Sequence, residues 1–181
     1  MHLITTRFNN DTWTENIKYR QVYNTPCIYG SPQELNSNKI QYQTSIFVIE
    51  MNNTTNQIEG IGLIKNFNHT DKYYLIHSDY NYNRYIYKSN YRLDRTHFLS
   101  THKVLLTTLE YIVFSEKSHL KRGSGFTVIN DKLISNKKHE LIKTVDIKKI
   151  ILLLKKMFKV VFSNNINISC PLRDFNTEIQ T

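Results

Sequence analysis

The first half of the chain alternates short apolar runs with Asn-rich segments, a pattern typical of β-strands joined by turns. The clearest pair of runs covers residues 45–51 and 57–65, and the Asn/Thr-rich segment between them predicts a β-hairpin. The segment 26–32 contains two prolines and Gly30 and is expected to form a loop. Shorter runs predict further strands at residues 3–8, 73–77, 84–88 and 126–129.

Three other segments carry apolar residues at the spacing of one helical face. The first is a short helix around Trp13, with Asp11 or Thr12 as its N-cap. The second covers residues 98–113, and the third and most regular covers residues 147–161. Lysines flank the apolar stripe of the third helix, which is also typical of helices on membrane surfaces. Packing of the stripe against a sheet explains the pattern, so we expect no membrane partner.

These elements predict an α+β protein with a small curved β-barrel, flanking helices and a basic, amphipathic C-terminal helix. Gly60 and Gly62 lie two residues apart, on one face of a strand. Missing side chains at such positions predict either tight curvature, as at the corner of a small barrel, or another backbone close by. We expect one domain over residues 1–162 and a polar tail over residues 163–181.

The charge balance indicates an anionic partner. The chain has 24 Lys and Arg against 15 Asp and Glu, a formal net charge of +9, and a pI near 9.5. Such a field attracts polyanions and speeds encounters with them. The alternative is that the charge serves solubility alone. The abundance of Asn, Ile, Lys and Tyr is typical of an AT-rich genome, such as that of a protist or a large DNA virus, and such coding favours Lys.

No pattern of a known catalytic or metal site occurs. The two cysteines, Cys27 and Cys170, lack the spacing of a zinc site, and we expect two reduced thiols rather than a disulfide. The first residues lack the apolar core of a secretory signal, which predicts a cytoplasmic protein (host cytoplasm or virion if viral). We expect no metal and no cofactor. An enzyme assembled from distant residues, such as His119 and Glu116, stays an alternative.

A basic, glycine-containing loop is predicted between the second helix and the last strand. Glycines let backbone N–H groups approach an oxyanion, while Lys and Arg supply charge. The alternative is a solvated loop in which Gly ends the preceding helix. The candidate phosphate-contacting residues of the loop are Lys117, His119, Lys121, Arg122 and Ser124.

A second candidate region interleaves aromatic and basic residues between residues 80 and 95. Tyrosines offer stacking platforms to bases, and arginines add cation–π contacts and charge. The candidates are Tyr85 and Tyr87 for stacking and Arg84, Arg92 and Arg95 for phosphate contacts. For any single tyrosine the alternative is a place in the core. Trp13, the sole tryptophan, is open to the same two interpretations.

The runs 46–51 and 58–64, the turn between them and the following Tyr85-Ile86-Tyr87 resemble the core of PUA-like domains, particularly their EVE and ASCH branches. Phe8 and residues 9–13 resemble the opening strand and Trp-bearing turn of the EVE type. The resemblance covers residues 3–95 and leaves the basic helical extension unplaced. It implies a pseudo-barrel that binds RNA or a modified base in an aromatic and polar cleft, with Trp13 as pocket aromatic.

Taken together, these features predict a non-catalytic protein that binds nucleic acid, RNA in preference to DNA, with recognition of a particular or modified base as a further option. Two alternatives remain open. One is a viral structural or assembly protein that acts through a protein partner or through self-association. The other is an enzyme that processes nucleic acid.

Overall fold

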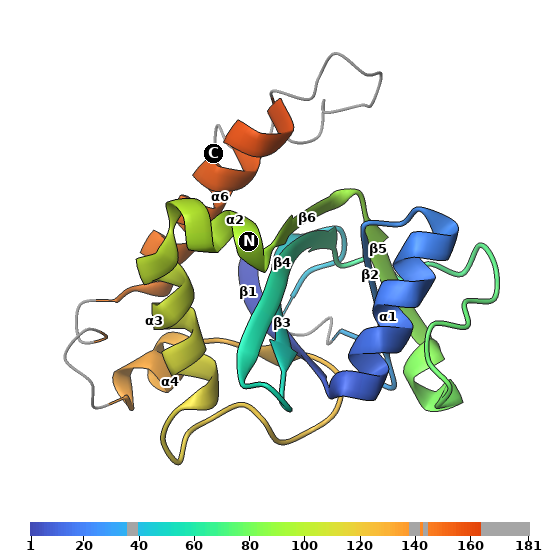
Figure 1. Cartoon of the computed structure of the whole chain (residues 1–181), viewed down its shortest axis with the longest axis horizontal. Helices are drawn as coiled ribbons and strands as arrows, with labels where there is room; N and C mark the ends of the chain where they lie inside the picture. Colours follow the sequence, from blue (N-terminus) through green and yellow to red (C-terminus); the bar gives the residue numbers. More distant parts are fainter. Residues whose placement is uncertain (36–39, 138–141, 143–144, 164–181) are drawn as a thin grey trace.

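The computed structural model describes residues 1–35, 40–137, 142 and 145–163 of the 181-residue chain. Two β-sheets lie face to face, and helices cover their outer sides (Figure 1). The elements in chain order are β1 (His2–Phe8), α1 (Asn10–Tyr23), β2 (Cys27–Ser31), β3 (Ser45–Asn52), β4 (Gln57–Lys65), the 3₁₀ helix η1 (Tyr80–Asn83), β5 (Tyr85–Ser89), β6 (Tyr91–Asp94), α2 (Arg95–Thr101), α3 (Lys103–Phe114), β7 (Thr127–Val128), α4 (Asp131–Ser135) and α6 (Ile147–Ser163).

The larger sheet has five strands in the order β6-β4-β3-β1-β7. The β1–β3 pair is parallel, and the other pairs are antiparallel. Side chains alternate along β3, so Phe47 and Ile49 join the core under the helices, whereas Ile46 and Val48 join the core between the sheets. Because both faces are covered, β3 is buried along its whole length and reads as one continuous apolar run.

The helices α2, α3 and α6 cover one face of this sheet (Figure 1). The stripe predicted for the last helix is confirmed, since Ile150, Leu154 and Phe158 are buried. The second predicted helix is instead two, α2 and α3, because the backbone leaves the helical region at His102. No helix within the described residues is long and apolar enough to cross a bilayer.

The smaller sheet pairs β2 with β5 and lies against the other face of the large one. The loop expected at residues 26–32 is wrong, because Cys27 and Tyr29 point into the inter-sheet core while Ile28 points towards α1. Gly30 fits this strand for a steric reason: a Cβ there would lie 2.0 Å from the carbonyl oxygen of Tyr82. The close backbone approach excludes a side chain.

The predicted barrel is wrong: the two sheets are not closed into one. The strands β2 and β5 pair with each other rather than with an edge of the large sheet, whose outer strands among the described residues are β6 and β7. The two glycines of β4 close no barrel, although the β3–β4 register shifts beside Gly60, between Glu50 and Met51. A Cβ at Gly60 would lie 2.6 Å from the Arg92 guanidinium, and one at Gly62 would lie 2.1 Å from the Tyr29 hydroxyl. The glycines therefore make room for buried polar side chains. At Gly60 the Leu93 carbonyl would also lie 2.7 Å from a Cβ, which is the close backbone approach that the sequence offered as an alternative.

The strand expected at residues 73–77 does not form, although its side chains alternate as in a strand, with Tyr74 and Ile76 buried. An asparagine side chain takes the place of a strand partner. The Oδ1 atom of Asn83 accepts from the amides of Ile76 and His77 at 3.0 Å each, and its Nδ2 donates to the His77 carbonyl at 2.7 Å. The side-chain amide thus fixes an extended segment outside both sheets.

Candidate nucleic-acid interface

The tyrosines predicted to stack on bases lie within or beside the core. Tyr87 is fully buried between the sheets, and its hydroxyl accepts from the Leu35 amide at 2.9 Å. Burial raises the pKa of Tyr87 to about 12. Tyr85 is half-buried against the same core, so both tyrosines share one face as the alternation predicted. Tyr87 presents no ring face to an incoming base.

Two of the three arginines predicted beside these tyrosines bind inside the protein. Arg95 donates to the Ile58 carbonyl at 2.8 Å and to the Glu110 carboxylate. Arg92 donates to the Glu50 carboxylate through Nε and Nη2 at 2.7–3.0 Å. Of the three, Arg84 alone is exposed.

Glu50 is the centre of a buried ionic cluster, which consists of Glu50, Arg20, Arg92 and Tyr29. The Glu50 side chain has no exposed surface and accepts from Arg20 Nη2 at 2.9 Å and from the Tyr29 hydroxyl at 2.7 Å, in addition to Arg92. Burial acts to raise the pKa of Glu50, but the two guanidinium groups outweigh it and hold the pKa below its ordinary value. The cluster is a charged core built from α1, β2, β3 and β6.

Trp13 packs on this cluster. The guanidinium carbons of Arg20 and Arg92 lie 5.0 and 5.7 Å from its ring centroid, and the Phe8 ring lies edge-on at 5.2 Å. The helix that carries Trp13 begins two or three residues earlier than expected. Its N-cap is Asn9, whose side chain accepts from the Thr12 amide. The half-buried Trp13 ring therefore stacks with cations of its own chain.

A surface hollow of about 550 Å³ brings together the aromatic and basic side chains that are free of the core. We call it the aromatic–basic pocket. The rings of Tyr73 and Tyr80 are 69% and 67% exposed, and Lys72 and Arg84 lie beside them. Its lining residues are His69, Thr70, Lys72, Tyr73, Tyr74, Tyr80, Asn83, Arg84 and Ile86.

The walls of the pocket are fixed by hydrogen bonds across three segments. The amide of His69 donates to the Ile86 carbonyl at 2.8 Å, which ties the first wall to β5. Asp79 caps η1 by accepting from the Asn81 amide. The Glu15 carboxylate of α1 contacts His77 Nδ1 at 3.0 Å and thereby holds the segment that leads into η1. The tyrosines therefore project from a supported frame.

The charges in the pocket are available to an anion. Among the described residues, Lys72 and Arg84 have no carboxylate partner. The Lys72 ammonium lies 5.0 Å from the ring centroid of Tyr23 and 5.2 Å from that of Tyr74. Burial and the nearby Lys88 ammonium lower the pKa of His69, so its imidazole is neutral at pH 7.

Sequence reasoning named Arg84 as a site residue and placed Tyr80 in the same aromatic and basic region, but it missed His69, Lys72 and Tyr73. His69, Lys72 and Tyr73 precede or begin the segment that alternation assigned to a strand. The signal that could have found them is the run of cation and tyrosines at residues 72–74, within a region rich in Asn and Tyr. This run forms part of a pocket only because residues 80–84 lie beside it, which the three-dimensional structure shows and the sequence does not.

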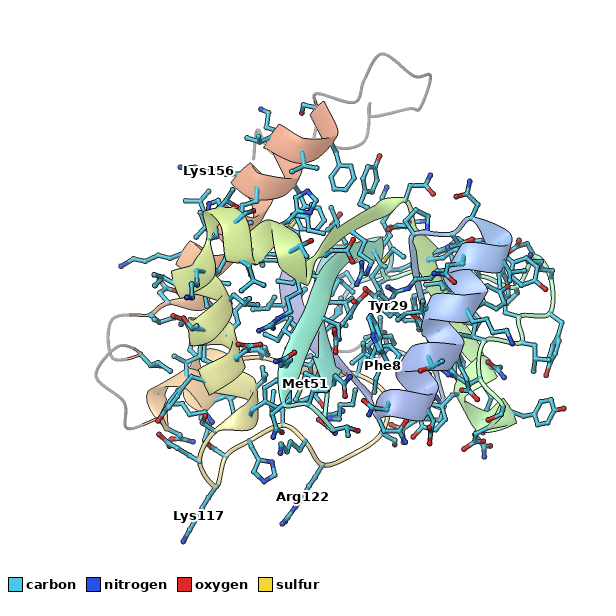
Figure 2. All side chains as sticks on the ribbon, in the orientation of Figure 1. Phe8, Tyr29, Met51, Lys117, Arg122 and Lys156 are labelled. Carbon is cyan, nitrogen blue, oxygen red and sulfur yellow. The ribbon has the colours of Figure 1, made fainter. Side chains whose placement is uncertain are left out.

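The basic loop, residues 117–125, is anchored to the sheets at its base. Arg7 donates to the carbonyls of Leu120 and Gly125, and Asn53 Nδ2 donates to the Lys121 carbonyl at 2.9 Å. Gly123 and Gly125 both have positive φ, which favours glycine. Lys117 and Arg122 point away from the body of the protein (Figure 2), and Ser124 is also exposed.

Arg7 also lies near η1. Burial lowers the pKa of Arg7, and the nearby Tyr82 hydroxyl of η1 acts in the opposite direction. Tyr82 is not among the residues that line the aromatic–basic pocket. The lysines of α6 belong to a different surface, since Lys156 lies at the opposite end of the molecule from Lys117 and Arg122 (Figure 2). The surplus positive charge is therefore divided between two regions.

His119 and Glu116, the residues named for a catalytic alternative, contact different partners. His119 Nδ1 accepts from the Lys121 amide at 3.3 Å, whereas the Glu116 carboxylate accepts from the Tyr111 hydroxyl. Within the described part of the chain, no group of three or more His, Cys, Asp or Glu residues could hold a metal ion. The thiol of Cys27 is free and buried, and Cys170 lies outside the described residues.

The pocket thus combines exposed rings with cations that lack a carboxylate partner among the described residues. The basic loop adds two further cations, Lys117 and Arg122, that point away from the body of the protein (Figure 2). Comparison with models of known families, with curated proteins and with solved structures gives no match. What the site does is therefore argued from its own chemistry.

Proposed function

We propose that the protein binds single-stranded nucleic acid, RNA in preference to DNA, without catalysis. The aromatic–basic pocket receives one or two bases, and the basic loop neutralises phosphates of the same strand. The observation that carries this proposal is the pair of exposed rings, Tyr73 and Tyr80, beside Lys72 and Arg84 in one hollow of about 550 Å³.

The chemistry of the pocket suits unpaired bases. Every base has a π-face, and stacking on an aromatic side chain contributes about 1–3 kcal/mol per base. In a duplex these faces are covered by neighbouring base pairs, so exposed tyrosines favour a single strand. The preference for RNA rests on the resemblance to PUA-like domains, whose members mostly bind RNA or modified bases in DNA or RNA. Membership of that family stays a prediction.

Fluorescence anisotropy with labelled oligonucleotides tests the proposal. Single-stranded and duplex RNA and DNA of equal length are titrated with the full chain at about 50 and 200 mM salt. We expect the single strands to bind more tightly than the duplexes. Tyr80→Ala should weaken single-strand binding by about 5- to 150-fold, the equivalent of one stacked base.

Tyr42→Ala is the matched control, because Tyr42 is comparably exposed and does not line the pocket. Its affinity should stay within about twofold of the wild type. Equal losses in both variants, or duplex binding as tight as single-strand binding, would contradict the assignment of the pocket.

The basic loop is tested separately by the double variant Lys121→Ala, Arg122→Ala. Each phosphate contact to a single strand contributes about −0.7 to the slope of log affinity against log salt. The double variant should therefore flatten the slope by up to about 1.4. The control is Lys156→Ala on α6. If affinity and slope both stay at wild-type values in the double variant, the loop is not part of the interface.

A further inference from the structure

An apolar groove of about 600 Å³ lies between the α2–α3 junction and α6. Its walls include Leu99 and Val104 on one side and Ile150 and Leu153 on the other. The helix is interrupted at His102, where α3 leaves the direction of α2 (Figure 1). His102 itself lines the groove. Its walls thus combine the outer surfaces of three helices whose inner surfaces pack on the sheet.

The groove exposes apolar side chains that the core does not use. Val104 is 77% exposed and Leu99 is 45% exposed. A contiguous apolar surface of this kind is costly to leave in water and marks an interaction site in many soluble proteins. The volume is in the range that small ligands or a few apolar side chains fill.

The surroundings of the groove are cationic. Lys103 and Lys149 line it, and Lys156 and Lys159 continue along the exposed face of α6. The one acidic residue among the lining residues, Asp146, accepts from the Lys148 amide at the start of α6. Charge complementarity therefore favours a partner with acidic groups beside its apolar ones.

We infer that this groove binds a helical segment of a protein partner with Leu, Ile or Phe on one face and Asp or Glu on its flanks. Such a segment places its apolar residues at positions i, i+3, i+4 and i+7 in the groove and its carboxylates against the lysines. Nucleic acid fits less well, because the lining contains no Phe, Tyr or Trp ring for stacking and only the imidazole of His102. A membrane surface is flat, whereas this site is concave. The inference is independent of the nucleic-acid proposal.

A display library of peptides of about 16 residues, long enough for four helical turns, is selected against the full chain. We expect enrichment of sequences that combine acidic residues with helically spaced Leu, Ile or Phe. The most enriched peptide, labelled with fluorescein, should bind Val104→Glu at least tenfold more weakly than the wild type. Val160→Glu is the control, because Val160 is exposed on α6 and does not line the groove.

Lys149→Glu should also weaken the acidic peptide by more than threefold, whereas Lys156→Glu should change it less. The inference is overturned if no selected peptide binds Val104→Glu more weakly than it binds the wild type. It is also overturned if Val104→Glu and Val160→Glu lose the same amount of peptide affinity. Groove-dependent binding to phosphatidylserine vesicles without peptide binding would assign the site to a membrane. A concentration-dependent rise in mass that Val104→Glu abolishes would assign it to a second copy of this chain. Both results would also overturn the inference.

Discussion

The buried ionic cluster and the aromatic–basic pocket both combine cationic side chains with tyrosines, but they differ in burial and in charge pairing. In the cluster, Arg20 and Arg92 surround a carboxylate that has no exposed surface. In the pocket, Lys72 and Arg84 have no carboxylate partner in the described part of the chain, and the tyrosines beside them are exposed. The charges of the cluster pair with one another, although the Arg20 Nε atom has no hydrogen-bond partner among the described residues. The cations of the pocket have no such internal pairing in that part of the chain.

Because the two regions differ in burial and charge pairing, they should respond differently to the loss of one charged group. A buried charge without its partner carries the full penalty of desolvation, so the cluster is sensitive to any change. An exposed charge is solvated by water and screened by salt, so its removal costs the fold little. The cluster should therefore control stability, and the pocket should control binding.

The largest expected effect is the loss of the carboxylate at the centre of the cluster. Glu50→Gln leaves the buried Arg20 without a counter-charge among the described residues and leaves Arg92 with the exposed Asp94 alone. It should lower the free energy of unfolding by about 3–5 kcal/mol. Urea unfolding followed by circular dichroism measures this change. Asp94→Asn is the control, because Asp94 also binds Arg92 but is exposed, and its loss should cost less than about 1 kcal/mol. Equal effects would show that burial does not distinguish the two carboxylates.

The pH dependence of stability should report the same group. Because the pKa of Glu50 is lower in the folded protein than its ordinary value of 4.5, the folded state binds fewer protons than the unfolded state in this range. Its contribution is complete above pH 4.5 and is lost as the pH falls through the folded pKa. Urea midpoints measured from pH 6 downward should fall below about pH 4.5 in the wild type. That part of the slope should be absent in Glu50→Gln, and an identical slope in both proteins would contradict the assignment.

Replacing Trp13 gives a further test of whether the cluster controls stability while the pocket controls binding. Its ring contacts both arginines of the cluster, so Trp13→Ala should destabilise the fold by about 2 kcal/mol through lost packing and cation–π contacts. Oligonucleotide affinity, measured where the variant is fully folded, should stay within about twofold of the wild type. A large loss of affinity with unchanged stability would instead support the role of pocket aromatic that the PUA-like resemblance implies.

The sequence predicted the elements whose patterns are local. The β3–β4 hairpin and the stripe of α6 depend on periodicities within one segment, and both formed as expected. The barrel was wrong because strand pairing is non-local. Nothing in residues 27–31 indicates that β2 pairs with β5, or that β1 lies parallel to β3. The short-range signal at Gly60 and Gly62 was real. The Tyr29 hydroxyl explains Gly62, whereas at Gly60 the Leu93 carbonyl lies close, as one of the two interpretations predicted, together with the Arg92 guanidinium.

The sequence predicted that the candidate site combines tyrosines with cations, but it did not predict which of these residues are exposed. Tyr80 and Tyr87 look alike in the sequence, and only the packing of β5 against the large sheet buries one and leaves the other exposed. Arg84 and Arg92 differ in the same way, because Arg92 lies opposite Gly62 on β4 and faces Glu50. A buried carboxylate at residue 50, within an apolar strand, was the one sequence signal that a buried cation must lie nearby.

The smallest expected effect is the most specific to the pocket. Arg84→Ala removes one exposed cation with no carboxylate partner among the described residues, so the free energy of unfolding should change by less than about 0.5 kcal/mol. The slope of log affinity against log salt for a single-stranded oligonucleotide should become flatter by about 0.7, the value of one phosphate contact. Lys132→Ala, an exposed lysine on α4, should leave the slope unchanged. If Arg84→Ala destabilised the protein or left the slope unaltered, the division between a structural cluster and a binding pocket would fail at the residue that best represents the pocket.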